Sequence, residues 1–382
     1  MITSIQPFIQ YFLRLGKLAK FNMLPLIHKN IPRGRVYLVL LSLALIAIVL
    51  VFRSLQTTDH AKLLPLAAMS NISPRDLAAN GTLGFHKILA LSTGPSWRTR
   101  GLDAAAQLTG LQITIPPQPR NPPELISAFA SIGKEQGATL PRLGSATAWM
   151  AHLDLLKYVV ASELTTAFIV EDDVDWDVRI KEQTKLISDN VRLHTGTSAE
   201  DTTPYGTEWD VLWLGHCGSL IADGMPEPRS YGDYSRCETA LYSGWSKQFL
   251  REKLAENHRL VQTSIQTVCT FGYGVTKSSA QKVLSLVGTG ADEAFDVSLS
   301  AHCRAGELRC LVVNPQVFNH YEPPAGHGYL SHVHVGDGQG NAASEKAEAE
   351  FEREMGTTGN IMKSARCEAL FHKTCMRPPS EI

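Results

Sequence analysis

The sequence predicts an α/β protein in which a mainly parallel sheet is flanked by helices and preceded by one N-terminal transmembrane helix. Short apolar runs alternate with segments of helical spacing, which is typical of strand–helix–strand units. One uncharged stretch near the N-terminus is long enough to cross a bilayer. The 382 residues include 36 basic and 37 acidic ones without a long basic face, which argues against nucleic acid as the main partner.

The uncharged stretch covers residues 36–52 (VYLVLLSLALIAIVLVF) and would span roughly 26 Å as a helix. Arg35 and Arg53 flank it and can snorkel to lengthen the span. A cleaved signal peptide is the alternative, but the apolar run starts too late and the basic region before it is too long. A buried core helix fits less well, because the stretch has no polar face.

The charges around the anchor predict its orientation. Six basic residues precede it, and residues 1–58 contain no Asp or Glu. The positive-inside rule therefore places the N-terminus in the cytoplasm and the rest of the chain in the lumen, as a single-pass type II protein. Glycosylation sequons at Asn71 and Asn80 agree with this, and the short span favours a Golgi or endoplasmic reticulum membrane.

We divide the chain by composition into five parts. They are a cytoplasmic basic tail (1–35), the anchor (36–52), a lumenal stem (53–84), a folded catalytic domain (85–335) and a C-terminal tail (336–382). All seven cysteines follow the anchor, so we expect some of them to pair in an oxidising lumen. The pairs close in sequence are Cys303 with Cys310 and Cys367 with Cys375, and the odd count leaves at least one thiol free.

The elements of the domain follow in order. A buried strand over residues 87–91 leads through the Gly94-Pro95 turn signal into a helix over 98–108 and a second strand over 111–115. A proline-rich loop precedes a helix over 145–164, whose apolar residues recur at helical spacing. Further strands are expected over 167–170, 210–215, 271–275 and 311–313, with helices over 278–286 and 342–354.

Five carboxylates crowd into the run Glu171-Asp172-Asp173-Val174-Asp175-Trp176-Asp177, directly after the strand over 167–170. Open α/β sheets bind ligands outside the carboxyl ends of their strands. Clustered carboxylates repel one another, and a bound hard cation relieves the repulsion. The run therefore predicts a divalent metal that bridges a diphosphate. A calcium loop is one alternative, although the glycine and terminal glutamate of an EF-hand are missing. A solvated acidic turn is the other.

The order of these segments resembles glycosyltransferase family 25, the group that includes lipooligosaccharide and collagen galactosyltransferases. The similar segments cover roughly residues 86–320. They are Ile88 to Arg100, Ser145 to Tyr158 with His152, Phe168 to Asp173, Asp210 to Gly215, Gly272 to Val275 with Ser278 to Leu284, and Asp292 to Asp296. The chain departs from the family at its first strand, where Ala90-Leu91-Ser92 replaces Asn-Leu-Asp, and on the helix, where only His152 matches.

The resemblance implies a GT-A-type fold, metal-dependent donor binding and inversion at the anomeric carbon. Asp173, with Asp175 as the nearest alternative, would ligate Mn²⁺ or Mg²⁺ and so offset charge on the departing diphosphate. Glu171 and Asp172 would contact ribose or sugar hydroxyls or orient the metal ligands. The base that deprotonates the acceptor would come from the later acids, with Asp296 or Asp292 first and Glu293 behind them. Alternatively, these acids only favour a helix N-terminus.

Basic residues near these acids have two interpretations each. His152 could contact phosphate or metal, or it could be a satisfied core histidine. Arg98 and Arg100 could bind phosphate, or they could lie on a solvated first helical turn. The histidines at 320, 327, 332 and 334 fit a loop over the site, and one of them could complete the metal shell.

The sequence thus predicts a type II membrane glycosyltransferase that moves a sugar to a glycan or protein hydroxyl. The donor would be a nucleotide sugar, UDP-galactose for example. A catalytically inactive lumenal scaffold and a metal-dependent hydrolase are the alternatives. Donor, acceptor, linkage and oligomeric state stay open.

Overall fold

A computed structural model describes residues 72–376. The predicted cytoplasmic tail (1–35), the anchor (36–52) and most of the stem lie outside these residues. Within residues 72–376, no helix is both long and apolar enough to cross a membrane.

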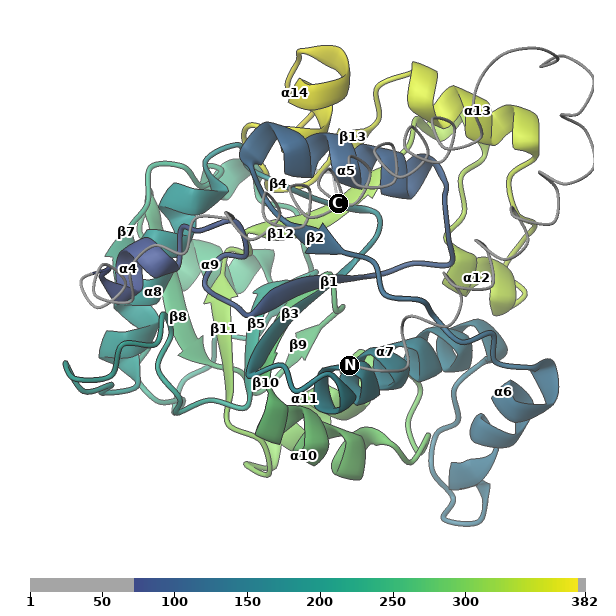
Figure 1. The fold of residues 1–382 in the computed structure, drawn as a ribbon, viewed down its shortest axis with the longest axis horizontal. Helices are drawn as coiled ribbons and strands as arrows, with labels where there is room; N and C mark the ends of the chain where they lie inside the picture. The colour runs from purple at the N-terminus through teal and green to yellow at the C-terminus, as the bar shows by residue number, and fades with distance from the viewer. Residues whose placement is uncertain (1–71, 377–382) are drawn as a thin grey trace, which may run out of the picture. The chain divides into compact units, whose positions relative to one another are not determined.

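The domain is a mixed α/β structure with a largely parallel central sheet (Figure 1). Its main path has the order β2-β1-β3-β10-β5-β11-β8-β7. Only β10 and β8 run against the other strands of this path. The path strands are β1 (Lys87–Leu91), β2 (Ile113–Thr114), β3 (Thr166–Glu171), β5 (Val211–Gly215), β7 (Arg229–Gly232), β8 (His258–Thr263), β10 (Gly272–Thr276) and β11 (Cys310–Asn314).

Shorter strands extend the sheet at the carboxyl end of β5. Phe318 pairs with Gly215, and β12 (Phe318–Glu322) also runs antiparallel to β4 (Val174–Trp176) and β13 (Thr357–Thr358). A separate ribbon joins β6 (Gly218–Ser219) to β9 (Thr267–Val268).

Helices cover both faces of the sheet, and Figure 1 shows α7, α10 and α11 together on one side of it. The longer helices are α5 (Trp97–Thr109), α7 (Leu143–Ala161), α8 (Ile180–His194), α10 (Lys277–Val287), α11 (Phe295–Arg304) and α13 (Glu345–Arg353). The shorter ones are α4 (Pro74–Leu77), α6 (Pro123–Phe129), α9 (Lys247–Lys253), α12 (His332–Gly336) and α14 (Ala365–Phe371), with 3₁₀ turns at Ile132–Lys134, Thr239–Leu241 and Ala325–His327.

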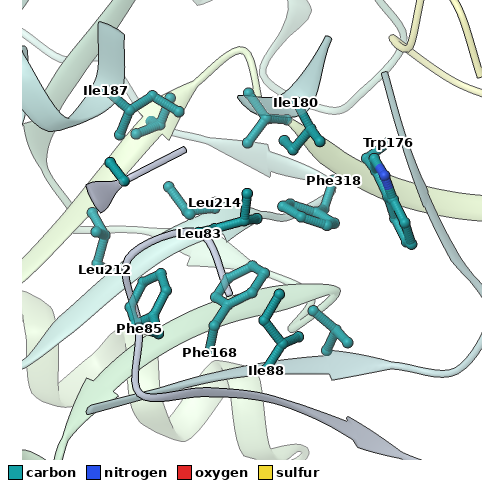
Figure 2. Close-up of a cluster of buried hydrophobic side chains, with 14 of the residues drawn as sticks. Leu83, Phe85, Ile88, Phe168, Trp176, Ile180, Ile187, Leu212, Leu214 and Phe318 are labelled. Carbon is teal, nitrogen blue, oxygen red and sulfur yellow. The ribbon is translucent and has the colours of Figure 1, made fainter. Parts of the chain in front are cut away.

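The strands are apolar on both faces because each face is covered by helices. Phe168 and Val170 of β3 point into the core shared with α5 and α8, whereas Ala167 and Ile169 point toward α7 and α10. Figure 2 shows the first core, in which residues of β1, β3, β5, β12 and α8 meet. This packing on both faces holds β3 in place, and the acidic run begins at the end of β3 with Glu171.

Two predicted boundaries differ from the structure. Ala78 and Leu83, in the predicted stem, are fully buried in the first core, so the fold begins before residue 85. The C-terminal segment is also part of the fold: Phe351 and Cys367 are buried against Trp97, and Figure 1 shows α13 and α14 beside α5. The predicted tail was judged from its polar composition, which does not reveal these few buried anchors.

Both predicted disulfides are confirmed: Cys303 pairs with Cys310, and Cys367 with Cys375. A third disulfide, Cys217 to Cys269, joins the segment after β5 to the segment before β10. Cys237 is a buried free thiol, as the odd number of cysteines requires.

Candidate active site

A cavity of about 830 Å³ lies at the carboxyl edge of the sheet. Its floor contains Leu91 and Ser92 after β1, Glu171 to Asp173 at the end of β3, and Cys269 to Phe271 before β10. The N-terminal half of α7, the first turn of α11 and residues 329–336 form its walls. Parallel strands bring their carboxyl ends to one edge, so this is where the topology gathers ligand-binding groups.

Glu171 is the last residue of β3, and its side chain keeps 29% exposure, toward the cavity. Its Oε1 accepts a hydrogen bond from the Thr270 hydroxyl at 3.3 Å. Burial, reinforced by the charge of Asp173, raises the pKa of Glu171 to about 8. The site therefore holds a carboxyl group that is readily protonated near neutral pH.

Asp172 is fixed by the loop after β1. Its Oδ2 accepts a hydrogen bond from the Ser92 hydroxyl at 2.6 Å, and its Oδ1 lies 4.0 Å from Nε of Arg98. Burial and the neighbouring Asp173 raise the pKa of Asp172 to about 6. Ser92 and Arg98 together orient the carboxylate.

Asp173 is the acid with unused bonding capacity. Its Oδ2 lies 3.2 Å from Nε2 of His320 and 3.6 Å from Nε of Arg98. Its Oδ1 is buried and has no hydrogen-bond partner. Burial alone would raise the pKa of Asp173, but the charges of His320 and Arg98 hold it well below its usual range. This oxygen lies at the cavity and is available to a cation, a water molecule or a bound ligand.

His320 is held on β12 rather than on a loop. Burial would lower the pKa of His320, but Asp173 and Glu322 raise it to about 10, so the ring carries a proton beside Asp173. Its ring stacks on Phe271 with 5.9 Å between centroids. The sequence placed this histidine on a loop because no apolar run marks β12.

Arg98 lines the cavity and reaches it from the first turn of α5, and its contact with phosphate stays a prediction. Its guanidinium lies over the ring of Trp97, and its Nη1 lies 3.3 Å from Nε2 of His332. Burial would lower the pKa of Arg98, but Asp173, Tyr329 and Asp172 raise it above the ordinary value. Arg98 is thus a fixed positive charge next to the acids.

Arg100 is a correction. Two residues along a helix point to different sides, and Arg100 faces α13, where its Nη2 donates to Oε2 of Glu352 at 2.8 Å. It does not line the cavity. Of the predicted pair, only Arg98 therefore lines the cavity.

Asp175 is the second correction, because it is a structural acceptor rather than a metal ligand. Its Oδ1 accepts from the backbone N–H groups of Trp176 at 2.8 Å and Arg366 at 3.0 Å, and its Oδ2 accepts from the Ser364 hydroxyl. It is fully buried and does not line the cavity. Asp177 likewise accepts from the backbone N–H groups of Arg179 and Lys363, both at 2.9 Å.

The predicted bases divide in the same way. Asp296 lines the cavity, and its Oδ2 accepts from the backbone N–H of Cys269 at 2.6 Å. Asp292 and Glu293 do not line the cavity, and Asp292 accepts from the backbone of Glu293. Asp296 is therefore the one of the three that the fold brings to the site.

His152 lines the cavity but is buried. Its Nδ1 lies 3.1 Å from the hydroxyl of Tyr273, and its Nε2 lies 3.2 Å from the hydroxyl of Thr270. Burial lowers the pKa of His152 to about 3, so the ring is neutral. The ring is 4.0 Å from Glu171 but touches no other acid of the run.

Of the remaining late histidines, His332 and His334 line the cavity. His327 does not, and its Nε2 lies 3.0 Å from Oε2 of Glu354. Ser92, Thr270 and Tyr329 are cavity residues that the sequence interpretation missed. Isolated polar residues after strands give no local signal, and only the position of Ser92 after the first strand could have suggested one of them.

Within residues 72–376, no three Asp, Glu, His or Cys side chains are grouped so that they could hold a metal ion alone. Magnesium-type ions in phosphate-transfer sites are usually held by one or two carboxylates together with water and substrate phosphates. Asp173, with its unpartnered Oδ1 next to His320, fits such a partial shell. Neither a protein-family model nor a curated protein sequence matches the chain.

Proposed function

We propose that the protein is a metal-dependent glycosyltransferase of GT-A type that moves a sugar from a nucleotide-sugar donor to a hydroxyl of a glycan or protein. The observation that supports this best is the pairing of Asp173 and Asp296 in one cavity. One acid has a buried oxygen without a partner, and the other is anchored through one oxygen only. A volume of about 830 Å³ is within the range that accommodates a nucleotide-sized ligand.

The donor side would be built by Asp173, His320 and Arg98. Asp173 and His320 would hold Mn²⁺ or Mg²⁺, which supplies Lewis-acid stabilisation of the departing diphosphate. Arg98 is buried and held by Trp97 and the acids, so it offers a positive charge that needs no reorganisation when the donor binds. Asp172, fixed by Ser92, has an oxygen facing Arg98 and can accept from a ribose or sugar hydroxyl.

The acceptor side would be built by Asp296. The backbone N–H of Cys269 fixes one oxygen of this carboxylate, and the other can accept the proton of the attacking hydroxyl. A single displacement with such a base inverts the anomeric carbon, as the resemblance to family 25 implies. Asp296 sits in the first turn of α11, which directs it into the cavity.

The lumenal location belongs to the same proposal, with residues 36–52 as the anchor. The three disulfides support it, because structural disulfides persist in oxidising compartments. Protease protection of sealed microsomes from cells that express the full chain provides the check. Cleavage of the cytoplasmic tail alone agrees with type II topology, and digestion of the folded domain contradicts it.

Activity is tested with the full chain in detergent, Mn²⁺ and a panel of nucleotide sugars, with and without oligosaccharide or peptide acceptors. We expect Mn²⁺-dependent release of nucleoside diphosphate that rises when an acceptor is present. Release of nucleoside diphosphate at the same rate with and without every acceptor would indicate a hydrolase. Failure to bind any donor would indicate a scaffold protein. Asp173→Asn should lower kcat/KM about 1000-fold, and Asp175→Asn provides the matched control in the same acidic run.

A further inference from the structure

Glu171 is connected to the interior by a chain of three polar side chains. The hydroxyl of Thr270 contacts Oε1 of Glu171 at 3.3 Å and Nε2 of His152 at 3.2 Å. Nδ1 of His152 contacts the hydroxyl of Tyr273 at 3.1 Å. His152 and Tyr273 are both buried, so water does not compete for the bond between them.

The number of protons fixes the direction of each bond. The hydroxyl of Tyr273 is buried, and the nitrogen of His152 is its one hydrogen-bond partner among residues 72–376, so the tyrosine must donate to Nδ1. A neutral imidazole that accepts at Nδ1 carries its proton on Nε2 and donates it to Thr270. Thr270 has one hydroxyl proton, which it donates to Oε1 of Glu171, so Oε2 is the oxygen that carries the proton when this carboxyl group is neutral.

The imidazole ring itself is locked in place. It stacks on Phe295 with 4.6 Å between centroids and an interplanar angle of 1°. Phe295 begins α11, and Asp296 follows it in the cavity. The same ring therefore ties the carboxylate of β3 to the helix that carries the proposed base.

We infer that His152 is a positioning residue, neutral with its proton on Nε2, which fixes the Glu171 carboxylate through Thr270 and does not contact the donor phosphates or the metal. His152 is thus a satisfied core histidine, the second of the two sequence-based interpretations, and the inference adds a positioning role to it. The inference about the tautomer depends only on the described contacts, whereas its effect on turnover rests on the proposed function.

The tautomer can be measured without activity. Full chain labelled with ¹⁵N in histidine only is examined by NMR at pH 7, and the His152 signal is assigned from its loss in His152→Gln. We expect a neutral ring protonated on Nε2, with one-bond correlation at that nitrogen. In Tyr273→Phe, Nδ1 loses its donor and its shift should move, whereas Thr270→Val should move the shift of Nε2. A charged ring, or a proton on Nδ1, would overturn the inference even if the enzyme is active.

The positioning effect is tested by kinetics on the same set. Thr270→Val removes the hydroxyl at constant shape and should lower kcat about tenfold or more, because groups that orient active-site ligands typically contribute 10- to 100-fold. Thr270→Ser keeps the hydroxyl and should restore kcat to within about threefold of wild type. Equal losses in the two variants would show a packing role only. If wild type has no activity while the Nε2 tautomer is found, the proposed function fails and the positioning chain stands.

Discussion

The acidic run contains two halves that differ in how their oxygens are used. Glu171 to Asp173 end β3 at the cavity, with opposing charges nearby and one buried oxygen left without a partner. Asp175 and Asp177, only a few residues later, accept hydrogen bonds that hold α14 and the segment before it in place. Residues of one type, in one short stretch, thus serve recognition in one half and folding in the other.

The direction of a pKa shift does not separate these halves. Burial raises the pKa of Asp175 to about 6, as it does that of Asp172. What distinguishes Asp175 is that backbone and hydroxyl donors occupy both of its oxygens. Unused acceptor capacity next to a cavity is therefore the better indicator of function in this molecule.

The largest effect is expected for Asp173→Asn. If Asp173 holds the metal, kcat/KM for transfer should fall about 1000-fold, or about 4 kcal/mol of transition-state stabilisation. Its free energy of unfolding should fall by about 1 kcal/mol, because the amide oxygen can still accept from His320 and the repulsion with Glu171 and Asp172 is relieved. Urea denaturation and steady-state kinetics on the same preparation measure both quantities. Retained turnover would remove Asp173 from the metal site.

Asp175→Ala should mainly lower stability, whereas Asp173→Asn should mainly lower activity. The change removes the acceptor of two backbone N–H groups and of the Ser364 hydroxyl, which are left buried without a partner. The free energy of unfolding should therefore fall by about 3 kcal/mol. Asp175→Asn keeps an acceptor and should lose about 1 kcal/mol. An alanine variant of wild-type stability would contradict the structural role.

The raised pKa of Asp175 predicts how the stability of the protein changes with pH. Its pKa is raised from 3.8 to about 6, so the folded protein binds the proton more tightly than the unfolded chain. The contribution of this group to stability is therefore largest at low pH and is lost as pH rises through this window. Asp175→Asn cannot titrate, so the stability difference between it and wild type should shift in its favour between pH 4 and pH 7, as measured by urea denaturation.

The strands that the sequence predicted correctly are those buried on both faces. β1, β3, β5 and β11 are continuous apolar runs, which local sequence reveals. The reversed direction of β10 was not predictable, because strand direction depends on the path of the chain between elements. β12 has only partial apolar character, since its His320 and Glu322 face the site.

The candidate site was predictable up to the end of β3. Glu171, Asp172, Asp173, Arg98 and Asp296 do line the cavity. Asp175 could not be separated from them, because its partners Ser364 and Arg366 are 189 and 191 residues away in the chain. Arg366, on α14, packs over Gly101 of α5, where a Cβ atom on Gly101 would overlap the guanidinium.

Removing a disulfide should destabilise the protein more when the disulfide supports the partners of Asp175. Cys367–Cys375 closes a separation of 8 residues around α14, and Cys303–Cys310 closes one of 7 residues away from the acidic run. Loop entropy predicts a loss of about 2.5 kcal/mol for either double alanine variant. We expect a further loss only for Cys367→Ala with Cys375→Ala, because α14 presents the backbone N–H that binds Asp175. If urea denaturation gives equal losses of unfolding free energy for the two double variants, the contact between α14 and Asp175 does not depend on the Cys367–Cys375 disulfide.

The proton on His320 should oppose metal binding. The ring is protonated below a pKa of about 10, so a metal that binds it near neutral pH must displace one proton. The affinity for Mn²⁺ should then rise about tenfold per pH unit between pH 6 and pH 8. Calorimetric titration of the full chain measures this slope. His320→Gln has no ring proton to displace and should bind Mn²⁺ more weakly with a shallower pH dependence, because only Glu171 and Asp172 then lose protons in this range. Asp175→Asn, in the structural half of the run, should keep the wild-type slope. A wild-type slope in His320→Gln would exclude His320 from the metal shell and leave Asp173 with the substrate phosphates as its partners.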